Sequence, residues 1–135
     1  MRNRELMHPD LYEILAAYGA TAVLAHHPSL PDLREQRVPS EGPLVVRWML
    51  RRGLRYDAAK ARYAPFRERR DPDDVTRDAI ADEVIEAALA ARPTYVIVNN
   101  KAEGSSPLSV RSLAEEVARR WPQEGASEPA EPRDA

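Results

Sequence analysis

The chain has 135 residues and a net charge of −2, with 43% hydrophobic and 31% charged residues. This length suits one modest domain, and the balance of residue types excludes wholesale disorder. Cysteine is absent, which excludes disulfides, thiolate metal sites and a cysteine nucleophile. No apolar run approaches the ~20 residues that cross a bilayer, and no secretory signal is present. We therefore expect no membrane partner and favour the cytoplasm of a bacterium-like cell.

The first part of the chain predicts one helix and two strands. Apolar residues recur at helical spacing over 8–18, with Ile14 and Tyr18 on the apolar face. The run 20–25 is apolar throughout and too short for a helix, which is typical of a strand buried on both faces of a parallel sheet. A proline-rich connection follows, and residues 44–50 predict a second strand of the same kind.

The middle of the chain predicts a long connection, a helix and a third strand. Residues 51–72 are basic, and a connection of this length is functional or hides a short helix around 57–61. Residues 73–91 have the apolar stripe of a helix, and 94–98 form another apolar run. Apolar strands joined by helices predict an α/β fold, in which helices cover the outside of a parallel sheet.

The last predicted helix precedes a polar tail. Ser106 and Pro107 are typical of an N-cap and a first helical position, and the helix extends to about Trp121. The stripe expected to be buried consists of Val110, Leu113, Val117 and Trp121. Residues 122–135 are polar and acidic with nothing to bury, so we expect a disordered tail after a domain at 1–121.

Several short segments together form a family pattern, in which Asn99-Asn100 at the end of the third strand is the most specific mark. The others are Arg2–Leu6, Tyr18–Ala20, Val23–Pro28, Leu44–Trp48, Arg62–Phe66, Asp71–Asp73 and Lys101–Pro107. The pattern resembles the YecE-like family (domain of unknown function 72), whose members adopt a TIM-barrel-like fold. The resemblance covers residues 1 to about 121 and corresponds to the C-terminal half of a family member. It implies a partial TIM-barrel-like parallel sheet with helices on the outside, because a full barrel needs roughly 250 residues.

The chain departs from the family pattern in two places. The glycine- and aromatic-rich first strand of the family has no counterpart, and Trp48-Met49-Leu50 stands where many members have a His-Gly. The resemblance therefore implies Arg47 as the family's strand arginine, and no histidine. Because the family has no settled activity, it implies a site location and no reaction. A truncated, non-catalytic remnant or interaction module stays an alternative, and exposed sheet edges would favour oligomers.

Polar side chains follow each predicted strand at the edge where parallel α/β folds place their active sites. They are His26 and His27 after the first strand, Arg47 near the end of the second, and Asn99 and Asn100 after the third. Arg47 is interpreted equally well as an anion ligand or as half of a structural ion pair. The two asparagines either bind a polar ligand or cap the turn with local hydrogen bonds.

The histidine pair does not predict a metal site. Adjacent residues of an extended chain point to opposite faces, so His26 and His27 cannot easily chelate one ion, and no carboxylate stands at ligand spacing. A general base is the alternative role. We expect no cofactor either, because the sequence has no Gly-rich dinucleotide fingerprint, Walker motif or Ser-His-Asp order.

The segment between the third strand and the last helix is the best candidate for a ligand site. Gly104 permits close approach of a backbone, and Ser105 and Ser106 lie where free amides at a helix N-terminus attract phosphate or carboxylate. Glu103 counts against this interpretation, and an ordinary capped helix is the alternative. We predict a small anionic, phosphorylated ligand held by Arg47, Asn99, Asn100, Lys101, Gly104, Ser105 and Ser106, with no activated nucleophile in view.

The basic segment 51–71 suggests a second kind of ligand. It contains eight positive and three negative residues, with Tyr56, Tyr63 and Phe66 among them. Single-stranded nucleic acid binds such a combination of charge and aromatic rings. A run of charge is more often solvated surface, however, and a pI near 5.9 lacks the basic character of nucleic-acid-binding domains. Nucleic acid is therefore an unlikely partner from sequence, kept as a second alternative.

Overall fold

Three parallel strands form the centre of the structure, a computed structural model that describes residues 4–122. The strands β1 (Leu24–His26), β2 (Leu44–Trp48) and β3 (Thr94–Val98) lie side by side in that order. Both pairings are parallel, and the register places Arg47 of β2 between Ala25 and Ile97. The parallel α/β sheet expected from the sequence is therefore confirmed, although β1 begins four residues later than the apolar run 20–25 predicts.

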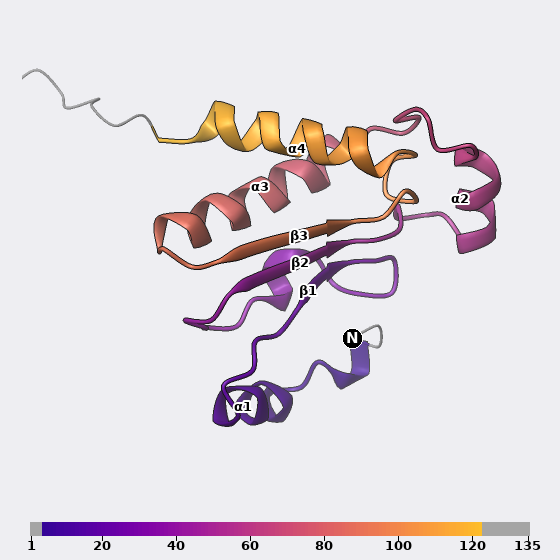
Figure 1. The fold of residues 1–135 in the computed structure, drawn as a ribbon. Coiled ribbons are helices and arrows are strands. Elements are labelled where there is room, and N and C mark those ends of the chain that lie inside the picture. The colour runs from indigo at the N-terminus through magenta and orange to yellow at the C-terminus, as the bar shows by residue number, and fades with distance from the viewer. Residues whose placement is uncertain (1–3, 123–135) are drawn as a thin grey trace, which may run out of the picture.

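The helices gather mainly on one face of this sheet (Figure 1). The helices of the described residues are η1 (Arg4–Leu6), α1 (Pro9–Ala17), η2 (Leu33–Gln36), α2 (Tyr56–Tyr63), α3 (Asp74–Leu89) and α4 (Ser106–Arg120). The helix α3 contacts β2 and β3, α4 contacts β3, and η2 contacts β1. In Figure 1, α1 lies beyond the β1 edge and α2 lies beyond the carboxyl ends of the strands. The short helix expected within the basic connection is confirmed as α2.

Local signals explain where the two long helices begin. The Asp73 side chain accepts a hydrogen bond from the backbone N–H of Thr76 at 3.1 Å, which is the N-cap interaction that starts α3. Ser105 is the N-cap residue of α4, one residue earlier than predicted, because Ser106 already has helical geometry. Pro107 stands in the first turn, where its missing N–H has no partner to lose.

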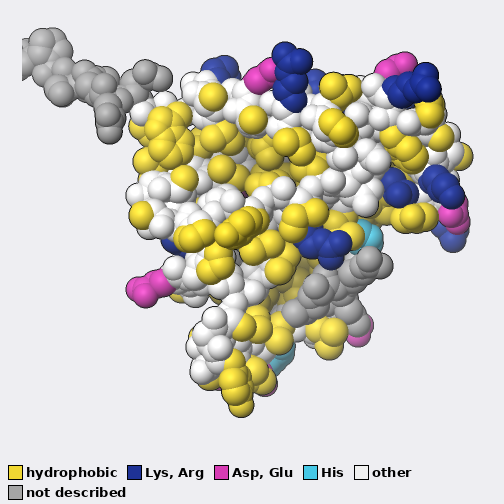
Figure 2. All heavy atoms as spheres, viewed as in Figure 1, with side chains coloured by type: hydrophobic (Ala, Val, Ile, Leu, Met, Phe, Trp, Pro, Cys, Tyr) yellow, Lys and Arg dark blue, Asp and Glu magenta, His cyan; other side chains and the backbone are white. Residues whose placement is uncertain are grey.

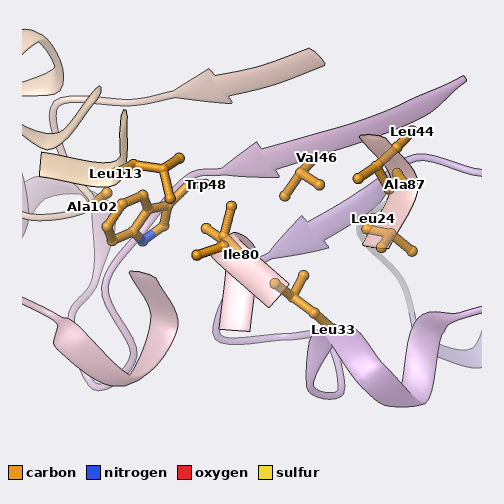
Figure 3. Packing of buried hydrophobic residues seen from close by; sticks show 10 residues of the cluster. Leu24, Leu33, Leu44, Val46, Trp48, Ile80, Ala87, Ala102 and Leu113 are labelled. Carbon is orange, nitrogen blue, oxygen red and sulfur yellow. The ribbon is translucent and has the colours of Figure 1, made fainter. Parts of the chain in front are cut away.

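The hydrophobic core lies between the sheet and the helix layer. Trp48 and Val46 project from β2 and are fully buried, and Ile80 of α3 packs over them (Figure 3). Figure 3 also shows Leu113 of α4 beside the Trp48 ring and Leu24 beside Leu44 at the amino end of the sheet. Burial of these side chains stabilises the sandwich of sheet and helices, at about 1.5–3 kcal/mol for each large side chain.

The other face of the sheet is open over β2 and β3, which corrects the expectation of strands buried on both faces for these two strands, whereas all three residues of β1 are buried as expected. Tyr95 and Ile97 of β3 are 58% and 53% exposed, and Arg47 of β2 shares their face. Figure 2 shows hydrophobic side chains on the surface over β2 and β3. Within residues 4–122, no helix or strand covers this face, because the helices that pack on the sheet lie opposite. The apolar runs correctly predicted the strands, but they predicted burial on both faces correctly only for β1.

Two predicted apolar helix faces are also less buried than expected. No residue of α1 is buried, and Ile14 and Tyr18 are exposed, because α1 packs at the periphery. In α4, Leu113 is buried and Val117 packs against the core, whereas Val110 and Trp121 are exposed, the latter by 39%. No helix in the described part of the chain is long and apolar enough to span a membrane. Apart from Pro122, the tail predicted at 122–135 lies outside the described residues.

Candidate functional site

The loops that follow the three strands are joined by backbone hydrogen bonds at one edge of the sheet. Met49 N–H donates to the His26 carbonyl at 3.1 Å, and Asn99 N–H donates to the Trp48 carbonyl at 2.8 Å. Arg51 N–H donates to the Lys101 carbonyl at 3.1 Å. The residues selected from sequence at the strand ends therefore do meet at this carboxyl edge. Because successive residues of a strand point to opposite faces, these residues are divided between the two sides of the sheet.

Arg47 lies on the open side of the sheet. Its neighbours in β2, Val46 and Trp48, point into the core, so the Arg47 side chain points away from the helices and is exposed. Among the described residues, Arg47 has no ion pair and no hydrogen bond from its side chain. The alternative role of Arg47 was one half of a structural ion pair, and Arg47 has no acidic partner for such a pair within residues 4–122.

The two asparagines have different positions. Asn99 continues the alternation of Tyr95 and Ile97 and is exposed on the side of Arg47. Its Oδ1 accepts the Lys101 N–H at 2.9 Å, which leaves the Nδ2 group without a protein acceptor in the described part of the chain. Asn100 is half-buried on the helix side, where its Oδ1 accepts the Ser106 N–H at 2.7 Å. Asn100 thus fixes the start of α4, and Asn99 retains donors for a ligand.

The loop before α4 is held mainly by bonds within the chain. Gly104 N–H donates to the Asn100 carbonyl at 2.8 Å, and Ser105 is buried with no capping bond from its hydroxyl. Gly104 has a φ of 119°, and a Cβ there would lie 2.5 Å from the Glu68 carbonyl oxygen. The close approach predicted for this glycine is therefore to the 68–70 backbone. The Nζ atom of Lys101 lies 4.3 Å from the centre of the Tyr56 ring.

The histidines are also separated. His26 is buried against α3, and its Nε2 lies 3.1 Å from the hydroxyl of Thr76, which donates to Asp73 Oδ2 at 2.8 Å. Burial lowers the pKa of His26 to about 4, partly opposed by the charge of Asp73, so the ring is neutral at pH 7. The Nδ1 atom of His27 bonds the Ser29 hydroxyl at 2.7 Å within a turn. Residues 4–122 contain no group of three metal-ligating side chains.

The relationship of this chain to known proteins rests on its match to a family model. The model described as "Protein of unknown function DUF72" matches residues 1–134. The chain belongs to the DUF72 family. This confirms the family resemblance seen in the sequence, and it leaves the function open. No curated protein and no solved structure matches the chain.

A buried ion pair lies behind the carboxyl edge of this DUF72 chain, and the sequence interpretation missed it. Glu103 is fully buried, and its Oε1 accepts hydrogen bonds from Arg77 Nη2 and from the Asp73 N–H, both at 2.6 Å. Arg77 also pairs with Asp74. The charge of Glu103, which counted against an anion site, is therefore matched inside the protein. A cleft of about 700 Å³ lies beside this cluster, between η2 and α3, with His26 and Thr76 in its wall.

The cleft does not contain an activated nucleophile among its described side chains. Thr76 is the hydroxyl nearest to His26, but it donates its proton to Asp73, so His26 does not accept it. The cleft is bordered by more acidic than basic residues, which are Asp32, Glu35, Asp73, Asp78 and Asp82 against Arg34, Arg51 and Arg52. An anionic ligand therefore fits the open side of the sheet, at Arg47, better than this cleft.

The basic segment is ordered around one buried hydroxyl. Tyr63 is buried and donates to Asp71 Oδ2 at 2.7 Å, while Arg62 donates to both oxygens of the same carboxylate. Burial raises the pKa of Tyr63 to about 12, and Arg62 lowers the pKa of Asp71. This cluster places α2 against the carboxyl edge and accounts for part of the positive charge of the segment.

Proposed function

We propose that this DUF72 chain binds a small anionic molecule, most simply a phosphorylated one, at the carboxyl edge of the sheet. The observation that carries the proposal is the exposed Arg47 guanidinium without an acidic partner within residues 4–122. A guanidinium offers several N–H donors in a planar fork that matches phosphate and carboxylate oxygens. Because no carboxylate of residues 4–122 occupies that fork, its donors are available to a ligand.

Asn99 is the second group on the same side. Arg47 is paired in register with Ile97, and Asn99 follows two residues later along the neighbouring strand direction. With ordinary strand spacing and rise, the Cα atoms of Arg47 and Asn99 are about 8 Å apart. An anion between them would accept bonds from the guanidinium and from Asn99 Nδ2. Lys101, Asn100, Gly104, Ser105 and Ser106 would support this site indirectly, by shaping the loop that carries Asn99.

The fold-level part of the proposal is a partial TIM-barrel-like arrangement. A parallel sheet with its helices on one face and apolar side chains such as Tyr95 and Ile97 on the other supports it. In such an arrangement the open face would become an interior, and Arg47 would point into the mouth of the barrel, where ligands bind. We propose binding only, because Arg47 and Asn99 are suited to electrostatic recognition and not to covalent chemistry.

Calorimetric titration with inorganic phosphate tests the proposal on the full chain. We expect Arg47→Ala to weaken binding at least about tenfold, which equals roughly 1.4 kcal/mol. Arg47→Lys should recover only part of the affinity, because a point charge cannot replace the bidentate fork. The matched control is Arg111→Ala, which removes an exposed arginine of α4, in the helix layer on the other side of the sheet, and should leave affinity unchanged.

Thermal unfolding of each variant checks that the fold is retained. Arg47 is exposed and makes no side-chain bond within residues 4–122, so neither substitution should change the Tm appreciably. Equal phosphate affinity in the wild type and Arg47→Ala would overturn the anion site. That result would favour the alternative of a non-catalytic interaction module, in which the open sheet face serves a contact with protein.

A further inference from the structure

A second feature of the carboxyl edge is a surface on which cationic and aromatic side chains alternate. We call it the α2 surface, and it consists of Arg55, Tyr56, Lys60, Phe66, Arg67 and Lys101. Figure 2 shows Lys and Arg side chains at the position of α2, with hydrophobic side chains between them. The surface combines the end of the β2 loop, the helix α2, the turn after it and the loop after β3.

The Tyr56 ring of the α2 surface is held in place but remains accessible, whereas Phe66 is half-buried. Lys101 Nζ lies 4.3 Å from the centre of the Tyr56 ring and 5.9 Å from that of Phe66, so one cation orders both rings. Tyr56 is nevertheless 59% exposed. Lys60 follows Tyr56 by four residues in α2, so their side chains are neighbours on one side of the helix.

Three cations of the α2 surface form no ion pair within the described part of the chain, although Asp57 and Glu68 of the same segment are also exposed. Other basic residues of the segment have partners: Arg62 binds Asp71, Arg52 binds Asp32, and Arg51 donates to backbone carbonyls. These contacts leave a different set, Arg55, Lys60 and Arg67, with no acidic partner among residues 4–122. The arginines with structural contacts are thus distinct from the exposed cations that have no acidic partner among residues 4–122. The net charge of −2 does not reveal this difference.

We propose that the α2 surface binds single-stranded nucleic acid. Phosphates would lie at the unpaired cations Arg55, Lys60 and Arg67, and a base would stack on the accessible side of Tyr56. Charge next to an exposed aromatic ring is the combination by which proteins hold single strands, because every base has a flat face and every nucleotide has a phosphate. A duplex fits less well, since its bases are stacked on one another. An acidic peptide would use the cations without the ring.

This inference does not rest on the anion site at Arg47. The α2 surface includes neither Arg47 nor Asn99, and Lys101, from the loop that follows Asn99, contacts Tyr56. Either proposal can therefore fail while the other stands. Arg47→Ala should weaken phosphate binding and leave the single strand bound, and variants of the α2 surface should do the reverse.

Fluorescence anisotropy of the full chain with labelled oligothymidylate, about a dozen nucleotides long, provides the test. Inorganic polyphosphate, which carries charge but no bases, is titrated in parallel. We expect Lys60→Ala and Arg67→Ala to weaken both probes and to lower the salt dependence by about 0.7 in logarithmic slope for each cation. Tyr56→Ala should weaken oligothymidylate at least about fivefold and leave polyphosphate unchanged.

Three controls complete the experiment. Tyr56→Phe keeps an aromatic face and should retain binding, and Arg111→Ala removes a distant exposed charge and should have no effect. If Tyr56→Ala lowers the Tm, Tyr56→Leu is used in its place, because leucine keeps a bulky apolar side chain without an aromatic face. Absence of oligothymidylate binding, equal loss of both probes in the Tyr56 variant, or tighter binding of a duplex of the same length would each overturn the proposal.

Discussion

The hydroxyl of Thr76 lies 3.1 Å from Nε2 of His26 and 2.8 Å from Oδ2 of Asp73, and so connects β1 to the first turn of α3. Because the hydroxyl donates to the carboxylate, the His26 ring donates from Nε2, and burial lowers the pKa of the ring to about 4, so it is uncharged at pH 7. The ring is buried, and no carboxylate among residues 4–122 forms an ion pair with it. Burial favours the neutral imidazole over the charged one, which links the stability of the fold to pH.

We expect the fold to lose stability as the pH falls from about 6.5 to about 4. The pKa of His26 is about 4 in the folded chain and 6.5 as an ordinary value, so between these pH values the unfolded chain binds more protons. The contribution is complete above pH 6.5 and amounts to about 3 kcal/mol at most. Urea unfolding of the wild type and His26→Gln across this range checks it. An identical pH dependence in both proteins would contradict the prediction.

The buried ion pair of Arg77 and Glu103 should be costly to break from one side. Glu103→Ala would leave the Arg77 guanidinium buried with Asp74 as its one ion-pair partner among residues 4–122, so we expect a loss of about 3–5 kcal/mol in the free energy of unfolding. Replacing both partners with apolar residues should cost much less than the sum of the single changes. Glu115→Ala, which breaks the exposed pair with Arg111, is the control and should cost under about 1 kcal/mol.

Gly104 should not tolerate a side chain. Its φ of 119° is one that side chains disfavour, and a Cβ would meet the Glu68 carbonyl oxygen at 2.5 Å. Gly53 has a φ of 82° with open space around it, so Gly53→Ala measures the conformational cost alone. We expect Gly104→Ala to destabilise the fold by at least about 1 kcal/mol more than Gly53→Ala in urea unfolding. Equal losses of stability in the two variants would show that the backbone near Glu68 can shift at little energetic cost.

The hydroxyl of Tyr63 should contribute to the position of α2. Tyr63→Phe removes a hydrogen bond of 2.7 Å to the Asp71 carboxylate and preserves the buried ring. Because the acceptor is charged and retains Arg62, we expect a loss of about 1.5 kcal/mol in the free energy of unfolding. Tyr95→Phe, at an exposed position of β3, serves as the control and should be nearly neutral. If Tyr63→Phe leaves the free energy of unfolding unchanged, the hydrogen bond to Asp71 does not hold α2 in position.

Features encoded by neighbouring residues could be predicted from the sequence. The strand at 94–98 matches β3 at both ends, and Asp73 marks the start of α3 by a capping bond to Thr76, only three residues away. The edge of the sheet that carries polar residues followed from the direction of the parallel strands. The Arg77–Glu103 pair could not be predicted, because its members are 26 residues apart and neither has a distinctive sequence context.

The sequence by itself determined that this chain forms parallel strands with helices between them, and that Arg47 and Asn99 lie near the same edge. It did so because apolar runs, caps and strand direction are local properties. Only the tertiary structure decided that His26 is buried against α3, that Arg47 lies on an uncovered face and that Lys101 lies over Tyr56. The physical reason is that alternate residues of a strand point to opposite sides, and which side is covered depends on packing between distant segments.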